Sequence, residues 1–177
     1  MIENKIQLKP SQVIELLSAA IQDSEAVFVA GSQGIGKSEC AIQAGHQTNH
    51  DILISLPPVE DPTAAGGCPW PVPESGKVKM LPYGRLAEAI ECKRPTLWIL
   101  DDLPHAPPAV QVSYMGLLWQ PAGVPRQING HLLPDHLKII ACGNLRKAGY
   151  GTHGMLEPVK GRFTLVEMRP DLNDFSN

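Results

Sequence analysis

The eight residues GSQGIGKS, from Gly31 to Ser38, have the glycine and lysine spacing of a loop that binds phosphate groups. Glycine lets successive backbone N–H groups turn toward phosphate oxygens, and the helix expected after the loop adds the positive end of its dipole. Lys37 has the length to reach the β and γ phosphates of a nucleotide, and the Ser38 hydroxyl suits Mg²⁺. The predicted nucleotide-binding residues are Gly31, Ser32, Gln33, Gly34, Ile35, Gly36, Lys37, Ser38 and Glu39.

A second motif with chemical meaning is the stretch TLWILDD, in which an apolar run ends in two acidic residues. In that arrangement Asp101 is placed to hold the Mg²⁺ shell, and Asp102 to orient or deprotonate an attacking water. A buried strand that simply ends at a polar cap would have the same residues, but the phosphate-loop pattern upstream favours the catalytic interpretation. The chain has no N-K-x-D stretch of the kind that binds a guanine base, and the chemistry alone leaves adenine and guanine nucleotides open.

Short apolar runs recur along the chain and predict the strands that position these motifs. Their hydrophobicity is continuous rather than alternating, which is typical of parallel strands covered on both faces. The predicted strands are Ala26 to Ala30, Asp51 to Leu56, Thr96 to Leu100, Leu137 to Cys142 and Phe163 to Met168. The sequence therefore predicts an α/β fold, a parallel five-stranded sheet sandwiched by helices.

Helical patterns lie between these runs. Ser11 is predicted to cap a first helix, a second should begin at Lys37, a third should span Tyr83 to Lys93, and a fourth should begin at Pro107 and Pro108. The residues expected to face the core are Val13, Leu16, Leu17, Ala20 and Ile21 in the first helix, and Val110, Tyr114, Leu117 and Leu118 in the fourth.

Two connections are too long to be simple turns. Residues 56–82 contain seven prolines and the stretch AAGGC, which predicts an irregular insert with a functional role, and Trp70 within it would either contact a partner or pack on the core. In residues 121–134, Asn129 and Gly130 predict a type I′ β-hairpin. Arg126 and His131 on that hairpin would either touch a substrate or be solvated.

Composition limits the remaining possibilities. The chain has 177 residues, 43% of them hydrophobic and 19% charged, which suits one α/β domain over residues 1–177. It has no secretory signal pattern and no apolar run long enough for a membrane helix, so we expect a cytoplasmic location without membrane contact. A net charge of −3 gives no bulk attraction to nucleic acid, although it leaves a local basic patch open.

Several residues receive structural interpretations. The four cysteines lie far apart with no C-x-x-C pair, which predicts buried free thiols rather than a zinc site: Cys40, Cys68, Cys92 and Cys142. His46 and His50 stand four residues apart, but no third ligand follows them, so we predict no metal site there. Trp98 and Trp119 lie in apolar surroundings and are predicted to be core residues.

The order of four segments over nearly all of residues 10–170 resembles an AAA+ ATPase, and more narrowly the MoxR-type, dynein-related branch. DPTAAGGCPWPVPESGKVKMLPYGRLAEAI resembles the insert around the second helix of that branch, and LWILDDLPHAPPAVQVSYMGLL resembles its acidic strand and the helix that begins with prolines. VPRQINGHLLPDHLKIIACGN resembles the hairpin before its sensor strand, and MLEPVKGRF its arginine-finger segment.

This resemblance implies a P-loop NTPase with an AAA+ core at residues 10–170, which binds and hydrolyses ATP with Mg²⁺. Asn144 would be the first sensor beside the γ-phosphate, and Arg162 would be an arginine finger that reaches the site of a neighbouring subunit. A finger supplied in trans contributes roughly 10³ to 10⁵ in rate, so assembly, in this family a hexameric ring, would control turnover. The energy would remodel an unidentified partner protein or complex.

Two departures from the family pattern favour alternatives. The family usually has Glu where this chain has Asp102, which would slow hydrolysis. The residues after the fifth predicted strand are too few for the helical lid of the family, so we expect that the lid is lost, is supplied by a partner or belongs to a longer chain. A nucleotide-gated binding module with little hydrolysis is therefore an alternative. A kinase of a small metabolite would need an arginine-bearing lid that the sequence does not reveal, and a GTP-using restriction-type relative would prefer GTP to ATP.

Overall fold

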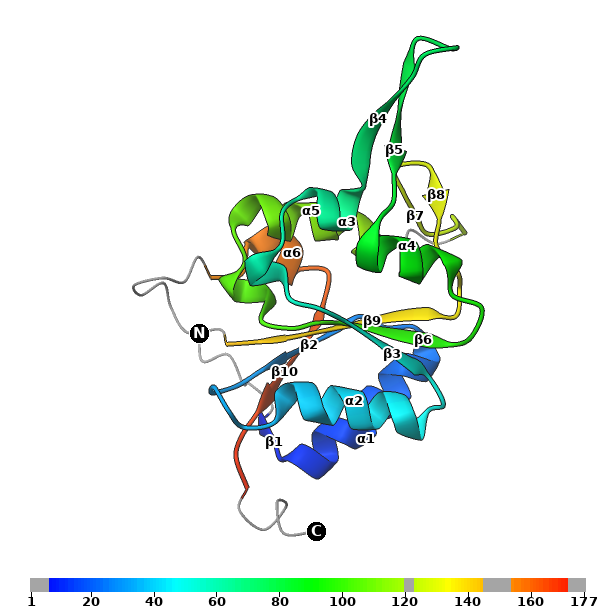
Figure 1. Cartoon of the computed structure of the whole chain (residues 1–177). Helices are drawn as coiled ribbons and strands as arrows, with labels where there is room; N and C mark the ends of the chain where they lie inside the picture. The colour runs from blue at the N-terminus through cyan, green and yellow to red at the C-terminus, as the bar shows by residue number, and fades with distance from the viewer. Residues whose placement is uncertain (1–6, 120–122, 145–153, 172–177) are drawn as a thin grey trace.

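A parallel sheet of six strands forms the centre of the molecule, with helices on both faces (Figure 1). The structure is a computed structural model that describes residues 7–119, 123–144 and 154–171. In spatial order the strands are β1 (Gln7–Leu8), β10 (Thr164–Met168), β2 (Val27–Ala30), β9 (Leu137–Gly143), β6 (Thr96–Leu100) and β3 (Asp51–Ser55). Every neighbouring pair is parallel, so the carboxyl ends of all six strands lie along one edge.

The predicted α/β fold is thus confirmed, and the sheet has one strand more than the five that the sequence predicted. The additional strand is β1, which pairs Gln7 with Glu167 and Leu8 with Met168 at the edge of the sheet. A strand of two residues is too short to show a periodicity, and for this reason the sequence pattern did not reveal it.

The two faces of the sheet are covered by different helices (Figure 1). Side chains alternate along β2: Val27 and Val29 join the hydrophobic cluster that includes α1 (Pro10–Asp23) and α2 (Lys37–Gln47), whereas Phe28 joins the opposite cluster. That second cluster includes residues from α3 (Thr63–Gly66), α4 (Gly84–Glu91), α5 (Pro108–Leu118) and α6 (Glu157–Lys160). The continuous apolar runs are therefore explained by burial on both faces.

The prediction that Ser11 caps the first helix is wrong. Helix α1 begins at Pro10, with Lys9 in extended conformation as the N-cap, because proline is well suited to the first helical position. The Lys9 backbone N–H donates to the side chain of Gln12 at 3.2 Å, and this bond caps the N-terminus of the helix. Four of the five residues predicted to face the core are buried: Val13, Leu17, Ala20 and Ile21.

The insert at residues 56–82 contains regular secondary structure, whereas the sequence predicted an irregular segment. A 3-10 turn (Pro57–Val59) and α3 precede an antiparallel hairpin formed by β4 (Cys68–Val72) and β5 (Lys77–Leu81), and this hairpin projects from the body (Figure 1). The sequence did not predict β4, because it contains Pro69 and Pro71 and proline usually interrupts a strand. A two-stranded hairpin has only edge strands, and an edge strand tolerates proline where its nitrogen points outward.

The hairpin predicted from Asn129 and Gly130 is confirmed. It consists of β7 (Gln127–Ile128) and β8 (His131–Leu132), and the two turn residues have φ values of 47° and 86°. Both values are positive, as a type I′ turn requires. Residues 121–122 of the predicted segment lie outside the described residues.

The burial predictions for tryptophan and cysteine are right for Trp98, Cys40 and Cys142, wrong for Trp119 and Cys68, and half right for Cys92, which is partly buried. Trp119 is 52% exposed, because α5 ends at Leu118 and the next residue leaves the helix in extended conformation. Cys68 is exposed on β4, whereas Cys40 and Cys142 are buried free thiols as predicted. Trp98 is fully buried and donates from Nε1 to Ser55 Oγ at 3.0 Å. Among the described residues, no helix is long and apolar enough to cross a membrane.

Candidate functional site

The loop from Gly31 to Gly36 connects the buried strand β2 to the start of α2. Gly34 and Gly36 have φ values of 75° and 85°, in the left-handed region that glycine adopts without strain. Gly31 allows a close approach, because a Cβ atom there would lie 2.6 Å from Ile35 Cδ1 and 2.9 Å from the backbone oxygen of Met168. The loop therefore packs against the end of β10 and turns its backbone toward the N-terminus of α2.

Lys37 is the first residue of α2, and its ammonium group folds back over the loop. Its Nζ donates to the backbone oxygen of Ser32 at 2.9 Å. Around it, Ser32, Gln33 and Gly34 are exposed, and so is Glu39 in the first turn of α2. Ile35 is buried in the hydrophobic cluster that includes α1 and α2.

Ser38 and Asp101 meet although 63 positions separate them. Ser38 Oγ donates to Asp101 Oδ1 at 2.7 Å, which joins the first turn of α2 to the end of β6. Cys142 lies buried beside this pair, and its burial raises the pKa of the thiol, with Asp101 adding to the effect. A neutral thiol therefore faces the hydroxyl and carboxylate, and those oxygen atoms are ligands that Mg²⁺ prefers.

Asp102 follows in a left-handed conformation with φ of 60°, at the start of the 3-10 turn Leu103–His105. Its Oδ1 lies 2.9 Å from His105 Nδ1, and its side chain is 53% exposed. Sequence reasoning missed His105. The available signal was its spacing of three residues from Asp102, which brings the two side chains together in a tight turn.

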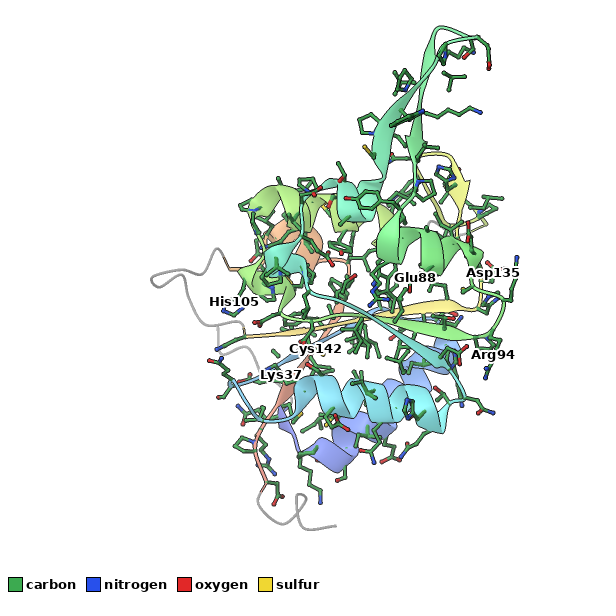
Figure 2. The ribbon with its side chains drawn as sticks, in the orientation of Figure 1. Lys37, Glu88, Arg94, His105, Asp135 and Cys142 are labelled. Atoms are coloured by element: carbon green, nitrogen blue, oxygen red, sulfur yellow. The ribbon has the colours of Figure 1, made fainter. Side chains whose placement is uncertain are left out.

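A cavity of about 190 Å³ lies at this edge of the sheet, lined by Gln33, Lys37, Asp102, His105 and Asn144. Figure 2 shows Lys37 and His105 at one end of the sheet, and Arg94 and Asp135 at the opposite end. Strands β2, β9 and β6 are adjacent and parallel, so their carboxyl ends lie together. The structure thus brings together four residues that the sequence singled out: Gln33, Lys37, Asp102 and Asn144.

The position of Asn144 depends on the glycine before it. A Cβ atom at Gly143 would lie 2.3 Å from Cδ of Pro104, so glycine lets the turn that follows Asp102 pack directly on the end of β9. The backbone N–H of Gly31 also donates to the Gly143 oxygen at 3.3 Å. These contacts hold the phosphate-loop pattern, the acidic motif and Asn144 in one unit.

Arg162 does not line this cavity. It follows the short helix α6, and its Nη1 donates to the Pro158 oxygen at 2.6 Å. Its Nε is buried and has no hydrogen-bond acceptor among the described residues. The structure therefore does not bring Arg162 to the cavity of its own chain.

Other residues singled out from the sequence lie elsewhere. His46 and His50 lie beside a pocket that also contains Asp51 and Arg94, and no group of three or more His, Cys, Asp or Glu among the described residues could hold a metal ion. Arg126 donates to the Leu137 oxygen and His131 lies 2.6 Å from the Met80 oxygen. The two hairpin side chains thus bond to backbone, and Trp70 is exposed on β4.

Comparison with known proteins yields matches to solved structures. No protein-family model matches the chain, and no curated protein sequence does so. A RuvB variant from Thermotoga maritima matches with a TM-score of 0.58 and 15% identity over 89% of this chain and 43% of that one. A protein from Cytophaga hutchinsonii assigned as an ATPase matches with a TM-score of 0.57 and 17% identity over 93% and 48%.

NtrX from Brucella abortus, solved in complex with ADP, matches with a TM-score of 0.56 and 15% identity over 89% of this chain and 34% of that one. The chain spans less than half the length of each of these three structures. Likeness at this level of identity shows the fold alone, an α/β fold with a central parallel sheet flanked by helices.

Proposed function

We propose that the chain binds ATP with Mg²⁺ at the cavity beside Lys37 and hydrolyses it. The observation that carries this proposal is the meeting of Lys37, the Ser38–Asp101 pair and Asp102 at the carboxyl ends of adjacent strands. A lysine, exposed loop N–H groups and a carboxylate next to a cavity are the parts that phosphoryl transfer to water requires.

The residues present fit both the nucleotide and the ion. The loop from Gly31 to Gly36 follows a buried strand and opens a helix, and a backbone of this kind cradles phosphate. Lys37 and the N–H groups at the start of α2 would hold the phosphates, and Ser38 and Asp101 would hold Mg²⁺. The ion, when bound, neutralises negative charge on the phosphate oxygens.

Three side chains of the cavity would act on water and on the terminal phosphate. Asp102 would accept a hydrogen bond from the attacking water, and His105 at 2.9 Å would fix the orientation of its carboxylate. Asn144, which lines the same cavity, would contact the terminal phosphate or the water. Because Asp102 and His105 are assigned to orient the water, direct attack by water without a covalent intermediate is the proposed route.

We propose further that Arg162 completes the site of a neighbouring copy in a ring, in agreement with its position away from the cavity of its own chain. A guanidinium carries five N–H donors in a planar fork, which suits phosphate, and Nη1 of Arg162 donates to the Pro158 oxygen. Membership of the MoxR-type branch, a hexameric ring and the remodelling of a partner protein follow from the resemblance of the four sequence segments.

A second candidate is a nucleotide-gated binding module with little hydrolysis. The observation that favours it is the short side chain of Asp102, whose Oδ1 already lies within hydrogen-bond distance of His105. In that case ATP would still bind, but no addition of protein or nucleotide would produce turnover.

Nucleotide binding tests the proposal first. ATP and GTP are titrated into the wild-type chain with and without Mg²⁺, and into Lys37→Ala, with Lys77→Ala on the projecting hairpin as the matched control. We expect ATP to bind more tightly than GTP, and Lys37→Ala to weaken ATP binding about 10- to 100-fold, because a hydrogen bond to a charged group contributes about 1.5–3 kcal/mol. Equal affinity in wild type and Lys37→Ala would exclude the assigned phosphate site.

A further inference from the structure

Gln111 is a polar side chain at the centre of the apolar packing around α5. Its exposed fraction is 0%, and the other buried polar residues among those described are Ser55 at 2% and Thr96 at 7%. Its neighbours in α5, Val110 and Tyr114, belong to the hydrophobic cluster on this face of the sheet. Burial of an amide is costly unless its hydrogen-bonding groups are paired, so the bonds of Gln111 identify what the position requires.

Both ends of the Gln111 amide are paired with backbone groups. Its Nε2 donates to the oxygen of Ala106 at 3.0 Å and to the oxygen of Gly154 at 2.8 Å. Its Oε1 accepts from the N–H of Leu156 at 3.0 Å. One side chain therefore joins two segments that are about fifty positions apart in the sequence.

The first of these segments carries Asp102. Ala106 closes the 3-10 turn that Asp102 opens, and its N–H donates to the Leu103 oxygen at 3.1 Å. Inside the turn, the N–H of His105 donates to the Asp102 oxygen at 2.9 Å. The turn that carries Asp102 is thus held by its own backbone hydrogen bonds, in addition to the bond from Gln111 to Ala106.

The second segment carries Arg162. Leu156 is the N-cap of α6, a helix of only four residues, and the N–H of Arg162 donates to the Val159 oxygen at 3.1 Å. Val159 is buried and attaches α6 to the core. Leu156 and Phe163 pack in the same cluster. Apolar contacts are not directional, so they constrain the rotation of a short helix less than the hydrogen bonds of Gln111 with Gly154 and Leu156 do.

We propose that Gln111 is a positioning residue that sets α6, and with it Arg162, against the turn that carries Asp102. The inference rests on the proposed function, in which Arg162 serves the site of a neighbouring copy. Each subunit would then present its arginine in an orientation tied to the state of its own site. Because the Asp102 turn has further bonds, loss of the Gln111 amide should disturb the arginine that a subunit donates more than the site that it holds.

The test uses Gln111→Met, which keeps the length of the side chain and removes all three hydrogen bonds. The matched control is Ser113→Ala on the same helix, because the Ser113 hydroxyl donates only within α5, to the Val110 oxygen at 2.7 Å. A second variant acts from the other side: Leu156→Pro removes the N–H at a position whose φ of −64° already suits proline, and it is compared with Leu156→Ala, which also loses the packed leucine side chain but keeps the N–H. Leu156→Pro keeps the question testable if Gln111→Met does not fold.

The first measurement is amide hydrogen exchange of the full chain without nucleotide. We expect Gln111→Met to speed exchange at Leu156 and along residues 157–162 at least tenfold, with no change in α2, and Ser113→Ala to leave both regions as in the wild type. Leu156→Pro should speed exchange along residues 157–162 in the same way. Unchanged exchange in either variant would overturn the positioning role.

The second measurement mixes two inactive variants. Lys37→Ala retains Arg162 but lacks the lysine of the site, whereas Arg162→Ala retains the site but lacks the arginine, so the mixture should recover turnover if sites are shared. Gln111→Met added to the Lys37→Ala chain should lower the recovered turnover at least tenfold, and added to the Arg162→Ala chain less than about threefold. If Gln111→Met does not fold, Leu156→Pro takes its place in both chains with the same expectation.

The outcomes separate the two proposals. Equal losses on both sides, or no loss on the side that donates arginine, would overturn the role of Gln111 while leaving the shared site intact. A mixture of Lys37→Ala and Arg162→Ala without any turnover would contradict the shared site itself, and the coupling through Gln111 with it. Ser113→Ala in either chain should leave the recovered turnover unchanged.

Discussion

The two parts of the proposed catalytic site are built in different ways. The phosphate-loop residues, the Ser38–Asp101 pair and Asn144 follow directly from the ends of three buried, adjacent strands. Arg162 instead follows a helix of four residues, which is attached by Val159 and a few flanking apolar side chains and by the hydrogen bonds of Gln111 with Gly154 and Leu156.

The difference shows how much of each part is fixed by the core. Displacing the first part requires movement of the parallel sheet, which is packed on both faces. Displacing the second requires the loss of a few directional bonds on one helix. We infer that the residues proposed to hold the nucleotide are rigidly placed, and that the proposed arginine is adjustable, as a group that serves a neighbouring copy would be.

The largest expected effect comes from removing the adjustable part. Arg162→Ala should lower ATP turnover roughly 10³- to 10⁵-fold and leave ATP affinity within about threefold of the wild type. Steady-state phosphate release and nucleotide titration measure the two quantities. Arg85→Ala is the control, because Arg85 is an exposed arginine paired with Glu88 at 2.7 Å. Turnover in Arg162→Ala within tenfold of the wild type would remove the distinction between the two parts.

The next effect concerns the carboxylate that faces the cavity. Asp102→Asn should lower turnover about 10²- to 10⁴-fold, because an amide cannot accept a proton from water. Asp102→Glu should raise turnover several-fold, since the longer side chain brings the carboxylate nearer to the water. Both are measured by phosphate release at saturating ATP. If neither substitution changes a near-zero rate while ATP still binds, the nucleotide-gated module is the better account.

A smaller effect should follow from crowding the rigid part. Gly31→Ala places a methyl group 2.9 Å from the backbone oxygen of Met168, so the loop or β10 must shift. We expect a loss of about 1–3 kcal/mol in the free energy of unfolding, measured with urea. Gly161→Ala is the control, with its nearest contact an ordinary 3.5 Å. Equal stability of Gly31→Ala and the wild type would mean that the loop is less tightly packed than described.

The smallest effect lies at the opposite end of the sheet. Partial burial lowers the pKa of His50, with Lys138 and His136 acting in the same direction, while the bond to the Thr48 oxygen and Asp51 oppose it. The folded state therefore binds this proton less readily than the unfolded state, and stability should fall as the pH drops below about 6.5. His50→Gln should lose less stability between pH 7.5 and 5 in urea unfolding. An identical pH profile would contradict this assignment.

The sequence was most informative where local patterns decide the structure. Continuous apolar runs predicted all the long strands of the sheet, and the pair Asn129 and Gly130 predicted the type I′ turn. The acidic pair after β6 and the glycine-rich loop before α2 also identified residues that the fold brings to one cavity. In each case the signal lies within a few neighbouring residues.

What the sequence did not reveal depends on distant partners. Edge strand β1 exists because β10 offers a free edge, and the prolines of β4 are tolerated because that hairpin has no inner strand. Gln111 appeared as one polar residue on an apolar helix, and only the fold brings Gly154 and Leu156 within reach of its amide. His105 likewise gains its meaning from the turn that places it beside Asp102.

The measurement that tests the central claim most directly is ATP turnover per chain over a wide range of protein concentration, at saturating ATP and Mg²⁺. If Arg162 completes the site of a neighbouring copy, specific activity should climb steeply with concentration and then level off as the assembly saturates. Specific activity that stays constant over the whole range, whether high or near zero while ATP still binds, would contradict a site shared between copies.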